Sequence, residues 1–475
     1  MKILLIEPNI KGYTFAPTLS LSLLKGFINE KTRHEAKIIE LVFHKKDWKK
    51  LVFEKIREEK PDIIGISVLS FNHSEALKIA RFIKYSFNIK IIFGGVHVIL
   101  SPQEVIENEE VDIICTGEGE EVLKELLDNN LNCKDIKGIW YKRDGEIIKN
   151  GKRRLIENLD TLPFPDFEDF DLEKYFVINN SHLPIMASRG CPYVCSYCSN
   201  HALSQKLDGK YVRFRSVNNV IEEIELRINQ LKGLKYLYFH DDIFILYEDF
   251  VIDFCKKFKD KGFHRILKWN ANVRVNLVTD KIIKTMKNAG CYEARMGVES
   301  GNDYIRNKVY KRNMTKEQIF NAFQIIKDNG LHLRLYFLVG APYETVEMLD
   351  ESFDVAKKSN ADLISFTYLL PLPGTEIKEV FEKENLLEYT NSGNFNHVVN
   401  PAEKTKFVSG KQMRRFLLKV KIWQIQKYFR EGIGMNGLFF LRDILLSLPY
   451  YKVKYDLGLK QIYRWTVQRY KLGKL

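Results

Sequence analysis

The first 130 residues alternate short apolar runs with amphipathic stretches. Five runs rich in Ile and Val predict strands at 2–8, 36–41, 62–69, 89–95 and 111–115. Such runs are typical of parallel strands that are buried on both faces. Stretches with helical periodicity lie between them, for example at 73–87. Alternation of strands and helices predicts a doubly wound, Rossmann-like parallel sheet, in which ligands bind beyond the carboxyl ends of the strands.

A second alternating region follows at 181–385. Six apolar runs predict strands at 183–188, 235–240, 267–273, 292–298, 331–340 and 362–370, with helical stretches between them. Six strand–helix units indicate a partial (β/α)6 barrel of the TIM type, since a complete barrel has eight. We interpret 131–180 as a connector, with a hairpin turning at 143–145. We expect 386–475 to be a mainly helical, basic segment.

The net charge of +13 is concentrated at one end of the chain. Residues 411–475 contain 15 Lys/Arg and 3 Asp/Glu, a balance of +12, which leaves about +1 for the other 410 residues. The composition, 45% hydrophobic and 12% aromatic, is that of a globular protein. No apolar run reaches the roughly 18 residues of a membrane span, and a signal peptide is not recognisable. We therefore expect a cytoplasmic protein with reduced thiols.

Three of the seven cysteines, Cys191, Cys195 and Cys198, lie within the stretch SRGCPYVCSYCSN. They follow the first predicted barrel strand, at the end where such barrels carry their chemistry. Three thiolates can hold three irons of a cubane cluster, and an iron without a protein ligand can bind a small molecule. A structural zinc site completed by His201, or a reactive thiol, are the alternatives.

The Cys191-x3-Cys195-x2-Cys198 spacing, with Tyr197 before the last cysteine, resembles the radical S-adenosylmethionine (radical SAM) enzymes. The resemblance implies a 4Fe–4S cluster whose open iron chelates the amino and carboxylate groups of SAM. An electron from the cluster then cleaves SAM to methionine and a 5′-deoxyadenosyl radical, which abstracts hydrogen from the substrate. It also implies an external electron donor such as flavodoxin or ferredoxin.

Other barrel residues match the pattern of this family. Asp241 and Asp242 end the second strand, where the family places polar groups near the SAM ammonium. Glu299 and Ser300 end the fourth strand, where the family contacts the ribose and methionine parts of SAM. Helix capping is the alternative for Asp242 and Ser300. The resemblance also points to Gly340, in a loop behind the adenine, and more weakly to Arg274, which a surface ion pair explains equally well.

The N-terminal sheet resembles the cobalamin-binding domains that are fused to radical SAM barrels. The residues that carry this resemblance follow the third, fourth and fifth strands: Ser67, Leu69, Gly94, Gly95, Gly117 and Glu118. Small residues there would let the backbone approach the bulky nucleotide tail of cobalamin. The loop after the first strand lacks the cobalt-ligating histidine of methionine-synthase-type domains, as do many radical SAM members. His73 and His97 are either neighbours of the corrin or structural.

The basic stretches 414–430 and 459–475 mix Lys and Arg with aromatic residues. They could bind an anionic membrane surface or nucleic acid, or form a solvated face over a packed aromatic side. We favour the packed interpretation, then peripheral membrane contact, and nucleic acid last.

Together the resemblances imply an enzyme that functionalises an unactivated C–H bond, and we favour cobalamin-dependent C-methylation with two SAM molecules. The alternative is non-methylating cyclisation, rearrangement or carbon–carbon coupling of a lipid-like or tetrapyrrole-like substrate. A zinc-stabilised nucleic-acid-binding protein is the least favoured hypothesis.

Overall fold

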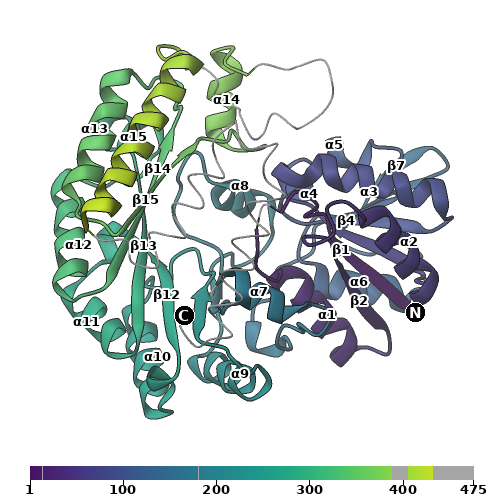
Figure 1. Ribbon diagram of the computed structural model, residues 1–475. Helices are drawn as coiled ribbons and strands as arrows, with labels where there is room; N and C mark the ends of the chain where they lie inside the picture. The colour runs from purple at the N-terminus through teal and green to yellow at the C-terminus, as the bar shows by residue number, and fades with distance from the viewer. Residues whose placement is uncertain (13, 180, 388–404, 432–475) are drawn as a thin grey trace.

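A seven-stranded sheet forms the N-terminal part of the molecule, drawn in purple and blue in Figure 1. The computed structural model describes residues 1–12, 14–179, 181–387 and 405–431. The five predicted strands are present as β1 (Lys2–Glu7), β2 (Glu35–Glu40), β3 (Ile63–Ser67), β4 (Lys90–Gly94) and β5 (Ile113–Cys115). They pair in parallel in the order β2-β1-β3-β4-β5. The strand order reverses between β1 and β3, which places the ligand crevice at the carboxyl ends of these strands.

Two further strands, β6 (Ile139–Arg143) and β7 (Glu146–Lys149), form the predicted hairpin. The sequence analysis placed this hairpin in a connector, but the hairpin is part of the first sheet. Strand β6 pairs antiparallel with β5, with Trp140 opposite Ile114, and so extends the sheet. The pairing satisfies the edge of β5, which would otherwise leave a row of open backbone groups.

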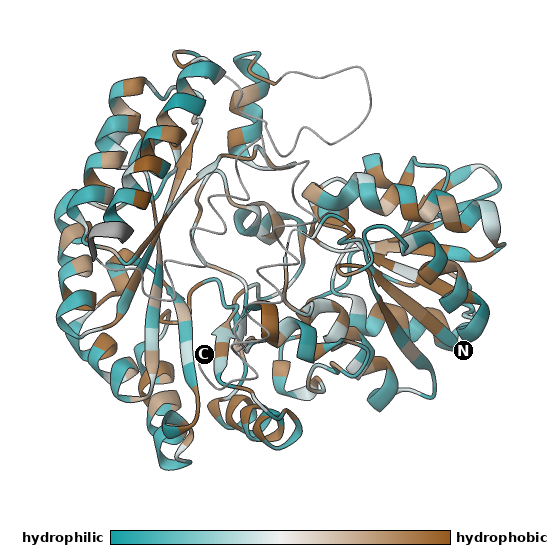
Figure 2. Ribbon diagram, viewed as in Figure 1, coloured by the Kyte–Doolittle hydropathy of each residue, from teal (hydrophilic) through white to brown (hydrophobic). Residues whose placement is uncertain are grey.

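Helices cover both faces of this sheet because its strands are apolar on both sides. In β1, Ile3 and Leu5 join the core under α1 and α6, while Leu4 and Ile6 join the core under α2 and α3. The helices that follow the strands are α1 (Leu19–Lys31), α2 (Trp48–Glu59), α3 (His73–Ser86), α4 (Val96–Leu100), α5 (Pro102–Ile106) and α6 (Gly119–Asp128). Figure 2 shows the sheet strands as largely hydrophobic between more polar helices.

The second sheet is a partial barrel of six parallel strands in the order β15-β14-β13-β12-β11-β8. Its strands are β8 (His182–Ile185), β11 (Tyr236–Phe239), β12 (Lys268–Val273), β13 (Cys291–Glu299), β14 (His332–Val339) and β15 (Leu363–Tyr368). Its outer layer, at the left of Figure 1, includes α10 (Glu248–Asp260), α11 (Asp280–Asn288), α12 (Lys316–Asp328) and α13 (Val346–Lys358), while α9 (Val217–Gln230) follows β10. The six-stranded partial barrel is therefore confirmed.

Side-chain alternation gives this barrel a concave face that carries polar groups. In β14, Leu333, Leu335 and Phe337 are fully buried against the helical layer. Arg334 and Tyr336 alternate with them and point to the other side of the sheet. The concave face can therefore hold chemistry while the convex face holds the core.

Shorter elements join the two sheets. The two-residue strands β9 (Ser188–Arg189) and β10 (Arg213–Phe214) pair with each other, and α7 (Leu172–Asn179), α8 (Ser199–Lys206) and α14 (Glu376–Lys383) lie near the junction. Helix α15 (Gly410–Glu431) packs on α13 through Met413, Phe416 and Val420. Within the described ranges, we find no helix long and apolar enough to cross a membrane. The basic stretch 459–475 lies outside the described residues.

Candidate active site

The three cysteines lie on one loop between β9 and α8, and all three are free thiols. The backbone fixes this loop at its start and by a hydrogen bond within it. Gly190, just before it, has a φ of +88°, and a Cβ there would lie 2.4 Å from the carbonyl oxygen of Tyr211. Inside the loop, the amide of Cys198 donates to the carbonyl of Cys195 at 3.1 Å. Cys195 is 5% exposed, while Cys191 and Cys198 are half-buried. Two of the thiols therefore remain accessible.

The geometry of the loop argues against the zinc alternative. In the described part of the chain, only His73, His97 and Glu104 bring three potential ligand atoms within 4.8 Å of one another. The three sulfur atoms do not converge in this way, although a single zinc with Zn–S bonds of about 2.3 Å would require it. The proposed fourth ligand, His201, places Nε2 3.5 Å from a carboxylate oxygen of Glu376. Among the described residues, no closed set of zinc ligands therefore forms at the cysteine loop.

Two buried arginines contact the central cysteine. Arg274 Nη1 and Arg312 Nη1 donate to Cys195 Sγ at 3.9 and 3.7 Å. Arg274 is only 3% exposed and its guanidinium lies 3.5 Å from the ring centroid of Tyr193. The surface ion-pair interpretation of Arg274 is therefore wrong. Two buried cations beside one thiol suit a thiolate-ligated cluster, whose negative charge would otherwise be uncompensated.

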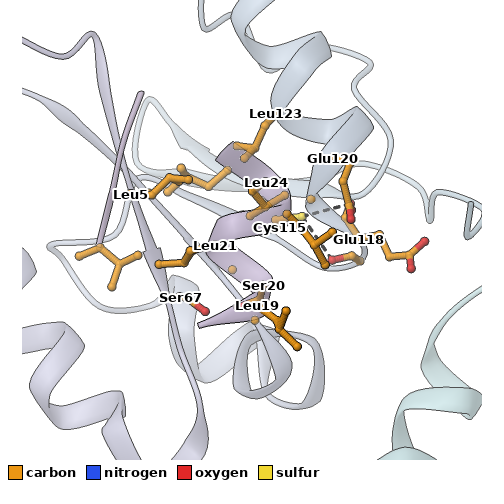
Figure 3. A pocket seen from close by; sticks show the side chains of 18 of the residues that line it. Leu5, Leu19, Ser20, Leu21, Leu24, Ser67, Cys115, Glu118, Glu120 and Leu123 are labelled. Carbon is orange, nitrogen blue, oxygen red and sulfur yellow. Dashed lines mark hydrogen bonds between the residues drawn. The ribbon is translucent and has the colours of Figure 1, made fainter. Parts of the chain in front are cut away.

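A cavity of about 410 Å³ opens at the carboxyl ends of the N-terminal strands. Figure 3 shows leucine side chains and Ser67 around it. Five of the six residues predicted to bind cobalamin line this cavity: Ser67, Gly94, Gly95, Gly117 and Glu118. The sixth, Leu69, does not line it and is 36% exposed. The apolar wall is formed by Leu5, Leu19, Leu21, Leu23, Leu24 and Leu123, which sequence inspection had not singled out.

The glycines of this cavity leave room that side chains would fill. Among the described residues, a Cβ on Gly94 would meet only the Cβ of Cys115, at 3.7 Å, and one on Gly117 would meet only Leu207, at 4.0 Å. The described part of the chain therefore leaves space at both positions. Gly95 serves the backbone instead, because its φ is +104° and a Cβ would lie 2.7 Å from the carbonyl oxygen of Val68. An apolar cavity with a glycine floor fits a bulky ligand tail.

Ion pairs connect this cavity to the cysteine loop. Arg189 Nη1 donates to Glu118 Oε1 and Arg189 Nη2 to Glu120 Oε1, both at 2.6 Å. Arg213 also donates to both oxygens of Glu118, each at 2.9 Å. Burial alone would raise the pKa of Glu118, but Arg213 and Arg189 hold it below its ordinary value. Because its oxygens are fully engaged, Glu118 positions the barrel against the sheet more than it contacts a ligand.

Comparison with known proteins agrees with this architecture. The radical SAM superfamily matches residues 185–356, and the B12 binding domain matches residues 9–127. An uncharacterized methyltransferase of Pyrococcus horikoshii is 32% identical over 450 residues, which cover 92% of this chain and 95% of that protein. The chain belongs to the B12-binding radical SAM enzymes. The predicted cluster, SAM and cobalamin are therefore confirmed as the cofactors of its family.

Two further comparisons extend this assignment. The anaerobic magnesium-protoporphyrin IX monomethyl ester cyclase of Rubrivivax gelatinosus is 29% identical over 71% of this chain and 62% of that protein. The cobalamin-dependent SAM radical enzyme OxsB, solved with aqua-cobalamin and SAM, superposes with a TM-score of 0.71. The match covers 98% of this chain and 71% of OxsB at 20% identity, so it concerns the fold.

The two aspartates at the end of β11 differ in what they can do in a radical SAM barrel. Asp241 is 1% exposed and accepts hydrogen bonds from Ser188 Oγ and, at 3.1 Å, from the amide of Ala187. It thereby fixes the strand that leads into the cysteine loop, and burial raises its pKa to about 6. Asp242 is exposed and accepts from Asn200 at 2.8 Å. Neither caps a helix, since α10 begins at Glu248. Asp242 therefore keeps an exposed carboxylate, whereas Asp241 is committed to its protein neighbours.

At the end of β13, Glu299 and Ser300 point in different directions. Glu299 has a φ of +69°, and burial raises the pKa of its carboxyl while Arg312 and Tyr197 oppose the rise. Tyr197 itself accepts from Arg312 at 3.3 Å. Ser300 is fully buried, and its hydroxyl lies 3.3 Å from Ser352 Oγ and accepts from the Asn302 amide. Ser300 does not cap the following helical turn, which begins at Tyr304 after Asp303 and has no side-chain cap bond. Its hydroxyl is engaged within the core instead.

The loop after β14 and the two histidines complete the predicted set. Gly340 has a φ of +96°, and its amide donates to the fully buried carboxylate of Glu344 at 2.7 Å. The positive φ and this hydrogen bond fix the shape of the loop. His73 and His97 are buried with ring centroids 4.4 Å apart, and Ser70 Oγ lies 3.0 Å from His97 Nδ1. Neither lines the cavity, which favours the structural interpretation of both.

Proposed function

We propose that this enzyme methylates an unactivated carbon of a small-molecule substrate in a cobalamin-dependent reaction. The observation that carries the proposal is the wall of the 410 Å³ cavity, to which the barrel contributes Met186, Arg189 and His240. Arg189 lies two residues before Cys191, so the residue that borders the cobalamin cavity also leads into the cluster loop. A methyl carrier and a radical source would thus face the same part of the barrel.

The residues of the chain divide the work between binding and orientation. Cys191, Cys195 and Cys198 would hold the cluster, with Arg274 and Arg312 balancing its charge at Cys195. Asp242 would accept hydrogen bonds from the SAM ammonium. When bound, the cluster supplies the electron that cleaves SAM, and cobalamin supplies the methyl group. The leucine-lined cavity would exclude water from the cobalamin tail.

The names of relatives support methyl transfer without deciding the substrate. The Pyrococcus protein is named a methyltransferase, and it matches this chain over nearly its whole length. The Rubrivivax protein is named a cyclase and matches 71% of this chain. Cyclisation is therefore the second candidate function. Formation of S-adenosylhomocysteine separates the two, because only methyl transfer consumes SAM as a methyl donor.

The first experiment is cofactor analysis of anaerobically purified protein, supplied with hydroxocobalamin and reconstituted with iron and sulfide. We expect about four irons and one cobalt per chain, with little zinc. With SAM and reductant, both 5′-deoxyadenosine and S-adenosylhomocysteine should form. Iron and 5′-deoxyadenosine without S-adenosylhomocysteine would favour cyclisation. Zinc without iron would refute the assignment of the cysteine loop.

Single alanine variants of the three loop cysteines should not cleave SAM. Cys133→Ala is the matched control, because Cys133 is 6% exposed and belongs to the core of the N-terminal sheet. It should bind iron and cleave SAM like the wild type. Normal 5′-deoxyadenosine formation by Cys195→Ala would contradict the proposed cluster ligation.

An external electron donor such as flavodoxin or ferredoxin is a further part of the proposal. So is a contact between the C-terminal segment and a membrane surface. In α15, Met413 and Phe416 are buried on the barrel, whereas Leu418 and Ile422 are each 48% exposed. The described part of the basic segment thus supports the packed interpretation, with an exposed apolar edge that a membrane surface could contact. Co-sedimentation with anionic vesicles should fall when 411–475 is deleted, and unchanged co-sedimentation would refute the contact.

A further inference from the structure

We propose that Arg295 and Arg334, on the concave face of the barrel, bind a carboxylate or phosphate group of the substrate. This inference rests on the proposed function, in which the substrate lies between the cobalamin cavity and the cluster loop. It adds the chemical class of substrate that the enzyme accepts.

Strand alternation directs both arginines to the concave face. Arg295 in β13 stands between Ala294 and Met296, which are fully buried against the helical layer. Arg334 stands likewise in β14 between buried leucines, and it is the register partner of Arg295. Like charges directly opposite each other on neighbouring strands are destabilising. An anion beside Arg295 and Arg334 would offset the repulsion between their charges.

Within the described ranges, one carboxylate pairs with the two guanidinium groups. Arg295 Nε donates to Glu293 Oε1 at 2.6 Å, and Arg334 Nε donates to Glu293 Oε2 at 3.2 Å. Glu293 is 2% exposed; burial would raise its pKa, but Arg334 and Arg295 hold it below the ordinary value. Glu293 is therefore ionised, and the three side chains carry a net charge of +1.

Both guanidinium groups keep their outer nitrogens available. Each uses Nε for Glu293, and within the described residues no acceptor lies within hydrogen-bond distance of the Nη atoms of Arg295 or Arg334. The side chains remain 13% and 30% exposed, so an anion in the barrel can reach them. Paired Nη groups of this kind match the geometry of carboxylate and phosphate oxygens.

The position of this arginine pair is the one that a substrate would occupy. The guanidinium of Arg295 lies 4.0 Å from the ring centroid of Tyr238, which in turn lies 4.2 Å from that of His240. His240 lines the cobalamin cavity. Two residues further along β13, the carbonyl of Gly297 accepts from Arg312, which contacts Cys195. The pair therefore lies between the cavity and the cluster loop.

The test is protection of individual arginines from phenylglyoxal in the reconstituted holoenzyme, read by peptide mass spectrometry. Three probes are compared at constant ionic strength set with sodium chloride: inorganic phosphate, succinate and SAM. Arg143, which is 63% exposed and lies in the β6–β7 hairpin, is the internal control. If Arg295 reacts too slowly to follow, Arg334 carries the measurement, because it is more exposed.

We expect phosphate or succinate to slow modification of Arg334 and Arg295 at least tenfold relative to Arg143. The anion that protects at lower concentration identifies the substrate group as phosphate or carboxylate. Arg334→Gln should raise the half-protecting concentration at Arg295 at least tenfold, whereas Arg143→Gln should not change it.

Two results would overturn the inference. If no probe slows modification of Arg334 and Arg295 relative to Arg143, the pair binds no anion. Protection by SAM alone would assign the pair to the SAM carboxylate and not to the substrate. Because the readout needs no methyl transfer, failure of the proposed methylation would leave it unaffected, and the two proposals fail separately.

Discussion

Replacing Arg189 with glutamine tests the contact between the two sheets. The guanidinium bonds Glu118 and Glu120 at 2.6 Å each, and the side chains of Arg189, Glu118 and Glu120 are 16%, 15% and 5% exposed. In the variant, Glu118 keeps Arg213, whereas Glu120 loses the only ion-pair partner it has in the described structure. Removing one partner of a buried pair costs about 3–5 kcal/mol. We therefore expect Arg189→Gln to lose about 3 kcal/mol of unfolding free energy.

The assay is urea unfolding of the metal-free protein, followed by tryptophan fluorescence and far-ultraviolet circular dichroism. Two packed sheets need not unfold in one step, so the midpoint of each transition is compared. With a slope of about 1–3 kcal/mol per molar urea, the expected loss moves a midpoint by about 1 M or more. Arg154→Gln is the control, because its pair with Glu157 is 70% and 64% exposed and should contribute below about 1 kcal/mol.

The pH dependence of this difference provides a second check. The folded pKa of Glu118 lies below its ordinary value, so its contribution is present above the unfolded pKa of about 4.3 and is lost as pH falls through the folded pKa. The gap between wild type and Arg189→Gln should therefore narrow below about pH 4. Adding Glu120→Gln to Arg189→Gln should recover part of the loss. An Arg189→Gln loss no larger than that of Arg154→Gln would refute the buried-pair reasoning.

Three further predictions concern the cofactors. Gly94→Val should weaken cobalamin binding at least tenfold in equilibrium dialysis without changing the circular dichroism spectrum, because the new side chain enters the cavity. Gly151→Val should bind cobalamin normally, because a Cβ there meets no described atom within 4 Å. Arg312→Gln should lower the cluster reduction potential in an EPR-monitored titration, by about 59 mV for a tenfold effect, and an unchanged potential would contradict its contact with Cys195. Asp242→Asn should raise the KM for SAM about tenfold with a smaller change in kcat; an unchanged KM would exclude it from the ammonium site.

Local sequence patterns were enough to predict much of the fold and the position of the cluster loop. The apolar runs predicted the five parallel strands of the first sheet and the six of the second, because alternation and burial act over a few residues. The cysteine loop could be found for the same reason, since its three ligands lie within eight residues. The cavity glycines Gly94, Gly95 and Gly117 were found through the resemblance to cobalamin-binding domains, because they lie at or near the carboxyl ends of strands.

Directions of individual side chains were harder to predict. The register of β13 against β14 shifts between Gly297 and Glu299, and a one-residue slip exchanges the two faces of a strand. The shift turns Ser300 into the core while Glu299 stays beside Tyr197 and Arg312. The sequence analysis placed Asp241 near SAM, but its carboxylate accepts hydrogen bonds from Ser188 and Ala187. These partners lie far from Asp241 along the chain.

The sequence by itself determined the succession of strands and helices along the chain, the cluster ligands and the family. The tertiary structure decided which charges meet. Arg312 reaches Cys195 across 117 residues, and Arg189 reaches Glu118 across 71. The anion site likewise exists only because β13 and β14 pair in one register. Electrostatic contacts depend on distance in space, and a linear pattern of residues records distance only along the chain.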